Sequence, residues 1–186
     1  MIEEGNLAPT QTDEEPTIPL TIQDENLDQA YGLSVGLYEA EDDRRKSTET
    51  KATLFMGSIS IATTIVIAAN ALIWNATIPG LIVKLMVAMS FFISVYAMRT
   101  VRYSLKVLKR SSYSVLDFND INRPANKFDY LRYLIKTYHE MTLSNSKVVN
   151  QKVTYLAMAQ ENYRRAIFVV SVYALVVLVY AIFFRV

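Results

Sequence analysis

Three runs of uncharged, mostly apolar residues divide this chain of 186 residues. They cover 52–74, 81–98 and 166–184, and the only charge inside them is Lys84, one turn from the start of the second run. A helix rises about 1.5 Å per residue, so runs of this length match a hydrocarbon core of about 30 Å. Shorter apolar runs, of about 10–14 residues, are typical of a buried helix in the core of a soluble protein. The pattern therefore predicts an all-α membrane protein with three transmembrane helices.

The positions of Lys and Arg predict the orientation of these helices. Cytoplasmic loops carry an excess of basic residues, whereas residues 75–80 carry none and the C-terminal end carries only Arg185. We therefore expect the N-terminus and residues 99–165 in the cytoplasm and the C-terminus outside. The flanking bases are Arg44, Arg45, Lys46 and Lys51 before the first run, Arg99, Arg102, Lys106, Lys109 and Arg110 after the second, and Lys152, Arg164 and Arg165 before the third.

The segments between the runs are polar and mostly helical in pattern. Residues 1–32 are acidic and poor in apolar side chains, as expected of a disordered tail without a signal peptide. Residues 33–51 predict a helix that continues into the first span. Residues 99–165 predict helical extensions that form a stalk, with a helix from about Asn126 and a break at 144–146. One face of that helix is apolar, with Leu131, Leu134, Ile135, Tyr138 and Met141.

The net charge of +1 is a cancellation between two regions. Residues 1–43 hold 12 of the 18 acidic residues and no Lys or Arg, so all 19 bases follow them. Two interpretations stay open for the acidic tail: it is solvated, or it folds back on the basic surface of the stalk and is displaced by a signal.

The sequence offers little for catalysis or for metal binding. It has no Cys and one histidine, His139, and it contains no phosphate-binding glycine loop and no nucleophile motif. Asp117 and Asp120 lie close together, but without further ligands nearby we interpret them as turn-forming or capping residues. We therefore expect no enzyme activity, no catalytic residue, no cofactor and no metal site.

Basic residues interleave with tyrosines between 99 and 165. Those next to the spans are accounted for by topology and by anionic lipid headgroups, without a nucleic-acid partner. Four others lie too far along the chain for that explanation and are candidates for binding a ligand: Arg123, Lys127, Arg132 and Lys136.

The first span carries a stripe of small residues on one face. Such a stripe lets helices approach closely in lipid, either within one chain or between the subunits of a homo-oligomer. Asn70 lies on a different face and needs a polar partner away from lipid, for which Tyr173 of the third span is a candidate. The stripe consists of Thr53, Gly57, Ser60, Thr64, Ala68 and Ala71.

Three short motifs resemble the bacterial Pycsar membrane effectors over roughly residues 40–186. Glu49-Thr50-Lys51-Ala52-Thr53-Leu54 resembles the acidic-x-Lys-Ala-small-Leu start of that family's first span. The segment 116–121 with Phe128-Asp129-Tyr130-Leu131 is similar to its aromatic-rich region after the second span. Residues 160–166, Gln-Glu-Asn-Tyr-Arg-Arg-Ala, resemble the basic start of its last span, although Asn162 stands where a Lys is common.

The resemblance implies an antiphage effector that impairs the inner membrane when a partner cyclase makes a cyclic pyrimidine mononucleotide. No β-rich nucleotide-binding module is recognisable, so a nucleotide would bind among the helices of 99–165. The alternative is a small membrane scaffold or accessory subunit that recruits a soluble partner through its cytoplasmic helices or acidic tail. An intramembrane enzyme is a third possibility, and it lacks a catalytic set.

Overall fold

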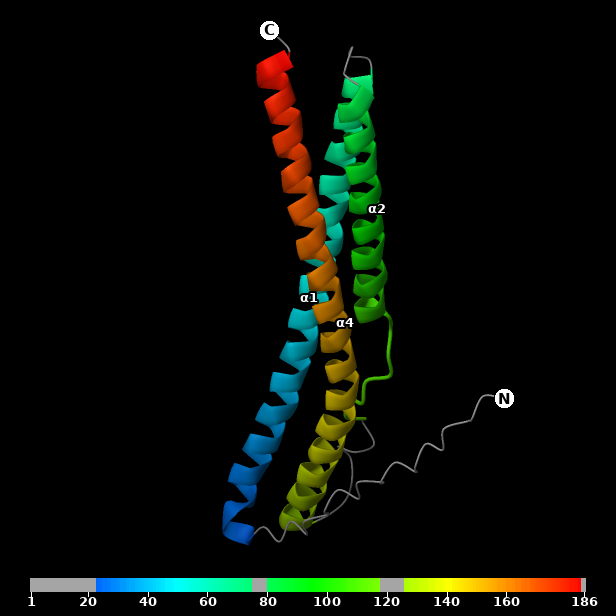
Figure 1. The fold of residues 1–186 in the computed structure, drawn as a ribbon. Helices are drawn as coiled ribbons and strands as arrows, with labels where there is room; N and C mark the ends of the chain where they lie inside the picture. The colour runs from blue at the N-terminus through cyan, green and yellow to red at the C-terminus, as the bar shows by residue number, and fades with distance from the viewer. Residues whose placement is uncertain (1–22, 75–79, 118–125, 185–186) are drawn as a thin grey trace, which may run out of the picture.

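The computed structural model describes residues 23–74, 80–117 and 126–184, and these residues form three long helices (Figure 1). Within those ranges there is no strand. The predicted all-helical fold is therefore confirmed. The elements are a 3-10 turn η1 (Asp24–Asn26), α1 (Leu27–Trp74), α2 (Gly80–Leu108) and α4 (Lys127–Phe184).

Helices α1 and α4 run parallel to each other, and α2 runs antiparallel to both along their upper part (Figure 1). Below the end of α2, residues 109–117 continue downward beside α4 without helical structure. The molecule therefore has two halves. The apolar half comprises 52–74, 80–98 and 166–184. The polar half comprises 23–51, 99–117 and 126–165.

A seven-residue repeat holds α1 against α4. Buried side chains of α4 recur at Asn145, Lys152, Ala159, Ala166 and Tyr173. Those of α1 recur in the same way, at Ala52, Ile59 and Val66. A seven-residue repeat keeps one face of each helix towards its partner, because the two helices coil slightly around each other. This explains how helices of 48 and 58 residues stay in contact along their length.

Side chains from all three helices meet inside the apolar half. One buried cluster joins Val66 of α1, Met86 and Ile93 of α2 and Tyr173 of α4. A second lies nearer the middle of the molecule and joins Ile59, Ala97 and Ala166. The small alanines let the helices approach closely at that level.

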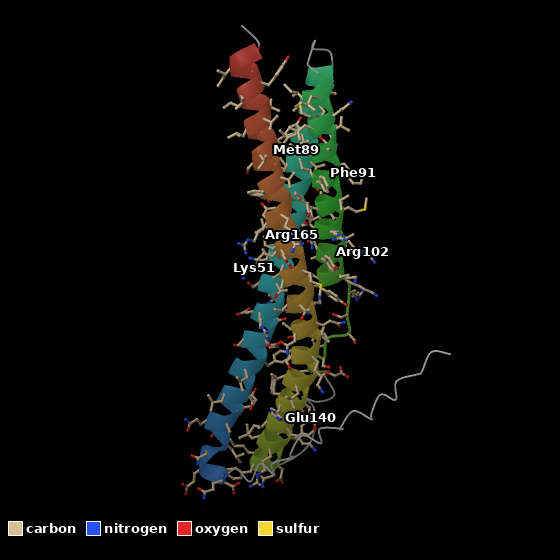
Figure 2. The ribbon with its side chains drawn as sticks, viewed as in Figure 1. Lys51, Met89, Phe91, Arg102, Glu140 and Arg165 are labelled. Carbon is tan, nitrogen blue, oxygen red and sulfur yellow. The ribbon has the colours of Figure 1, made fainter. Side chains whose placement is uncertain are left out.

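The outer surface of the apolar half is also apolar. Large side chains such as Ile65, Phe91 and Phe168 point outward and are more than 60% exposed. Three helices are long and apolar enough to cross a membrane, which confirms that part of the prediction. In Figure 2, Met89 and Phe91 lie in this half, whereas Lys51, Arg102 and Arg165 lie together at one level below it.

The lower end of the molecule, which we call the base, joins the starts of α1 and α4. Leu27 is fully buried against Leu131 and Ile135. The backbone N–H of Tyr130 donates to the carbonyl of Asn126 at 2.9 Å, which places Asn126 where the helix was expected to begin. The boundary predicted for the tail, residue 32, is wrong because burial of Leu27 extends the helix back to that residue. Residues 1–22 lie outside the described part.

The break predicted at 144–146 is also wrong, because α4 is continuous from Lys127 to Phe184. Asn145 is buried there and uses its amide to bind another segment, and Ser146 donates to the carbonyl of Leu143 at 3.1 Å. Ser and Asn disfavour a helix only weakly, so these tertiary contacts decide the outcome.

Candidate functional site

The four predicted ligand-binding bases do not form one cluster. Lys127 reaches across the base to α1 and Arg132 to the preceding turn η1, whereas Lys136 pairs with Glu140 one turn further along its own helix, at 3.8 Å. Arg123 lies outside the described residues. The structure therefore places two of the four candidates against acidic side chains at the N-terminal end of the described chain.

Acidic side chains of η1 and of the first turn of α1 pair with these two bases. Arg132 Nη2 lies 2.6 Å from Asp24 Oδ1, and Lys127 Nζ lies 3.4 Å from Asp28 Oδ2. All four side chains are more than half exposed. The segment 24–28 therefore contacts bases of α4, whereas residues 1–22 of the predicted tail lie outside the described residues.

Above the base, four tyrosines of α1, α4 and the connecting segment 109–117 contact one another at edge-to-face or tilted angles. Tyr38 contacts Tyr138 with ring centroids 5.6 Å apart and Tyr113 at 6.3 Å, and Tyr31 contacts Tyr138 at 6.0 Å. The guanidinium of Arg45 lies over the Tyr113 ring, 4.1 Å from its centroid. Because Tyr113 follows the end of α2 at Leu108, its contact with Tyr38 joins the connecting segment to α1.

Burial of the tyrosine cluster changes the acidity of its hydroxyls. Loss of water raises the pKa of Tyr38 and of Tyr113, and the nearby carboxylate of Asp42 raises both further. Burial also raises the pKa of Tyr138, and Tyr31 adds to the effect. All three phenols are therefore held in the neutral form.

Asn145 fixes the connecting segment to α4. Its Oδ1 accepts from the backbone N–H of Ser114 at 2.8 Å, and its Nδ2 donates to the Ser114 carbonyl at 3.0 Å. The hydroxyl of Tyr38 donates to the same carbonyl at 3.3 Å. Sequence reasoning missed this contact. The signal was an Asn at a buried position of the seven-residue repeat, which is a known device for setting the register of helices.

In the polar half, a buried lysine of α4 pairs with a half-buried glutamate of α1. Lys152 Nζ lies 2.5 Å from Glu49 Oε1, and the Lys152 side chain is only 8% exposed. The sequence predicted Lys152 as a flanking base, whereas its side chain faces α1. A buried charge needs a close partner, so this pair couples the positions of the two helices along their common axis.

In the apolar half, one hydrogen-bonded group joins all three helices. The Tyr173 hydroxyl donates to Asn70 Oδ1 at 2.7 Å, which is the pairing that the sequence suggested. Asn70 Nδ2 donates in turn to Ser90 Oγ at 2.8 Å, and Ser90 donates to the carbonyl of Met86. Ser90 was not anticipated. Its hydroxyl accepts a hydrogen bond from the amide nitrogen, so both the oxygen and the nitrogen of the Asn70 amide have a partner.

The stripe of small residues on α1 faces away from the other helices. All six residues are exposed, and a Cβ added at Gly57 would meet no other atom within 4 Å. The hydroxyls of Thr53, Ser60 and Thr64 donate to carbonyls of their own helix. The alternative in which the stripe packs the three helices of one chain together is therefore excluded.

The described ranges contain no group of three or more His, Asp or Glu residues able to hold a metal ion. Their polar groups are cations, carboxylates, amides and phenols, which suit the binding of charged molecules and of helices. Comparisons of the chain with protein-family models, with curated proteins and with solved structures return no match.

Proposed function

We propose that the protein is a non-enzymatic integral membrane effector whose oligomer impairs the bacterial inner membrane when a cytoplasmic signal reaches its stalk. The polar half and the N-terminus lie in the cytoplasm, and the C-terminus lies outside. The signal is a cyclic mononucleotide made during phage infection, as the family resemblance implies.

One observation carries the proposal: α1 and α4 pass without interruption from the charged base into the apolar half. A displacement at the base is therefore transmitted along two paired helices to the helices that cross the membrane. A ligand drives such a change only if it binds the two arrangements with different affinity.

The orientation is supported by a belt of basic residues at the lower edge of the apolar half (Figure 2). Above this belt, the described residues carry a single charge, that of Lys84. By the positive-inside rule the belt faces the cytoplasm. The belt comprises Lys51, Arg99, Arg102, Lys106, Arg164 and Arg165.

Because the chain has no Cys, single cysteines test this orientation directly. Gly80→Cys and Ser111→Cys place a thiol at two exposed positions, one at each side of the predicted bilayer. We expect a membrane-impermeant maleimide to label Gly80→Cys in intact spheroplasts and Ser111→Cys only after lysis. The reverse labelling would overturn the proposed orientation.

The oligomer is supported by glycines on the outer face of α1. Gly36 and Gly57 are 21 residues apart, which is three repeats, so they share one line on the face opposite α4. Glycine weakens a helix by about 1 kcal/mol relative to alanine. A Cβ added at either glycine would meet no side chain or other segment of the chain within 4 Å. Close packing of a second copy of the chain against this face would explain why glycines occupy it.

The permeability function is tested with the full chain in phosphatidylethanolamine–phosphatidylglycerol vesicles that contain a self-quenching dye. We expect cyclic UMP or cyclic CMP at the polar half to release the dye. Gly57→Leu should abolish both release and cross-linked oligomers, whereas Ser58→Leu, which adds bulk on a neighbouring face, should retain both. Vesicles that stay sealed with both nucleotides would overturn the effector function and favour the scaffold.

A further inference from the structure

The base of the stalk carries two cations whose present partners are carboxylates of the same chain. Asp24 of η1 and Asp28 of α1 stand four residues apart in the chain, and each pairs with one base of α4. The contact joins segments about 100 residues apart in the chain, so it closes the acidic region onto the basic one.

The position of the two carboxylates is fixed by packing. Leu27 lies between them in the chain and is fully buried against Leu131 and Ile135, with Ala30 and Tyr31 beside it. Burial of a leucine side chain supplies far more stabilisation than an exposed ion pair does. The acids are therefore held at the cations by an apolar anchor, and this holds even when their charges are screened by salt.

The ion pairs themselves are open to solvent. Each of the four side chains is more than half exposed, from 53% for Arg132 to 77% for Asp28. Exposed pairs of this kind are weak, so an anion with two or more charges can compete for the same cations. Arg132 in particular offers the planar donor fork that binds phosphate oxygens in pairs.

The location selects a soluble anion over a lipid. Arg132 and Arg165 are 33 residues apart on one continuous helix, which corresponds to about 50 Å. Headgroups of the membrane at the basic belt therefore do not reach the base. A phosphate-bearing small molecule in the cytoplasm does.

We propose that Lys127 and Arg132 form a phosphate-binding site and that Asp24 and Asp28 are its built-in competitor. The carboxylates occupy the cations in the resting state, and a soluble phosphate compound must displace them to bind. This inference rests on the proposed function for the identity of the signal, but the competition itself is measured without any membrane readout.

The test measures binding of inorganic pyrophosphate to the full chain in lipid nanodiscs by titration calorimetry at low salt. Asp24→Asn with Asp28→Asn should bind pyrophosphate about tenfold more tightly than the native chain, because two exposed pairs no longer compete. The matched control is Glu25→Gln with Glu39→Gln. It removes the same charge from two exposed residues of the same region that make no ion pair among the described residues.

A second arm tests the cations. In the Asp24→Asn, Asp28→Asn chain, adding Lys127→Gln and Arg132→Gln should abolish the gain, whereas Lys109→Gln with Lys147→Gln should retain it. Equal tightening in the matched acidic control, or a gain that survives loss of Lys127 and Arg132, would overturn the proposal. A tenfold gain alongside vesicles that never leak would support this competition while overturning the effector function.

Discussion

Helices α1 and α4 are held together by different kinds of contact in the two halves of the molecule. In the apolar half, the buried repeat positions of α4 are Ala166 and Tyr173, and apart from the hydrogen bond of Tyr173 to Asn70 the helices approach through small and apolar side chains. In the polar half, the repeat positions Asn145 and Lys152 are buried polar side chains, and each has a specific partner on another segment. Apolar packing tolerates small shifts along the axis, whereas a buried amide or ammonium group does not. The polar half therefore sets the register that the apolar half follows.

The ion pair between the buried Lys152 and Glu49 gives the largest expected effect. Glu49→Ala leaves the ammonium of Lys152 buried without a partner, and we expect a loss of about 3 kcal/mol in the free energy of unfolding. Urea unfolding of the full chain in nanodiscs, followed by circular dichroism, measures it. Restoring an apolar pair with Glu49→Leu and Lys152→Met should recover most of the loss. If the double substitution does not recover stability, the two charges stabilise the fold in addition to setting the axial position of the helices.

Loss of the Asn145 amide should come next. Asn145→Leu leaves the backbone N–H and carbonyl of Ser114 without the partner on α4, with an expected cost of about 2 kcal/mol. Hydrogen exchange at residues 111–117 should rise sharply, while exchange in the apolar half stays unchanged. As a control, Asn150→Leu alters an exposed residue whose side chain accepts a hydrogen bond from Arg44 and makes no hydrogen bond with Ser114, and it should leave residues 111–117 protected.

The hydrogen-bonded group of the apolar half should matter less. Asn70→Leu or Tyr173→Phe removes the bond between two helices, and such bonds in lipid contribute about 0.6 kcal/mol on average and at most about 1.7. Unfolding in mixed micelles by increasing dodecyl sulfate measures the change. A loss larger than that of Asn145→Leu would contradict the comparison, because the apolar half would then depend more on polar contacts than the polar half does.

The smallest effect concerns pH and should be confined to the polar half. The pKa values of Tyr38, Tyr113 and Tyr138 lie above the ordinary 10.0 in the folded chain, mainly because of burial. Their contribution to stability is therefore complete below pH 10 and is lost as pH rises through the raised values. We expect thermal unfolding of the polar half to shift downward above pH 10. The variant with Phe at all three positions should lose that part of the pH dependence.

The sequence by itself determined the features that follow from whether lipid, water or protein surrounds each part of a helix. Runs of 18 or more apolar residues predict helices that lipid can surround, and the spacing of Leu131, Leu134 and Ile135 predicts the buried face at the base. The need of Asn70 for a polar partner also follows from the sequence, because an amide facing lipid is costly.

Only the tertiary structure decided which polar residues are buried and what they bind. Ser144 to Ser146 read as a helix break, yet Asn145 lies inside a continuous helix because its amide binds a segment 31 residues away in the chain. Asp24 belonged to a stretch interpreted as tail, yet burial of the neighbouring Leu27 sets it against Arg132. Local propensities differ by less than 1 kcal/mol per residue, so contacts between distant segments outweigh them. The same holds for the small stripe on α1: its composition is evident in the sequence, but that it faces outward depends on where α2 and α4 pack.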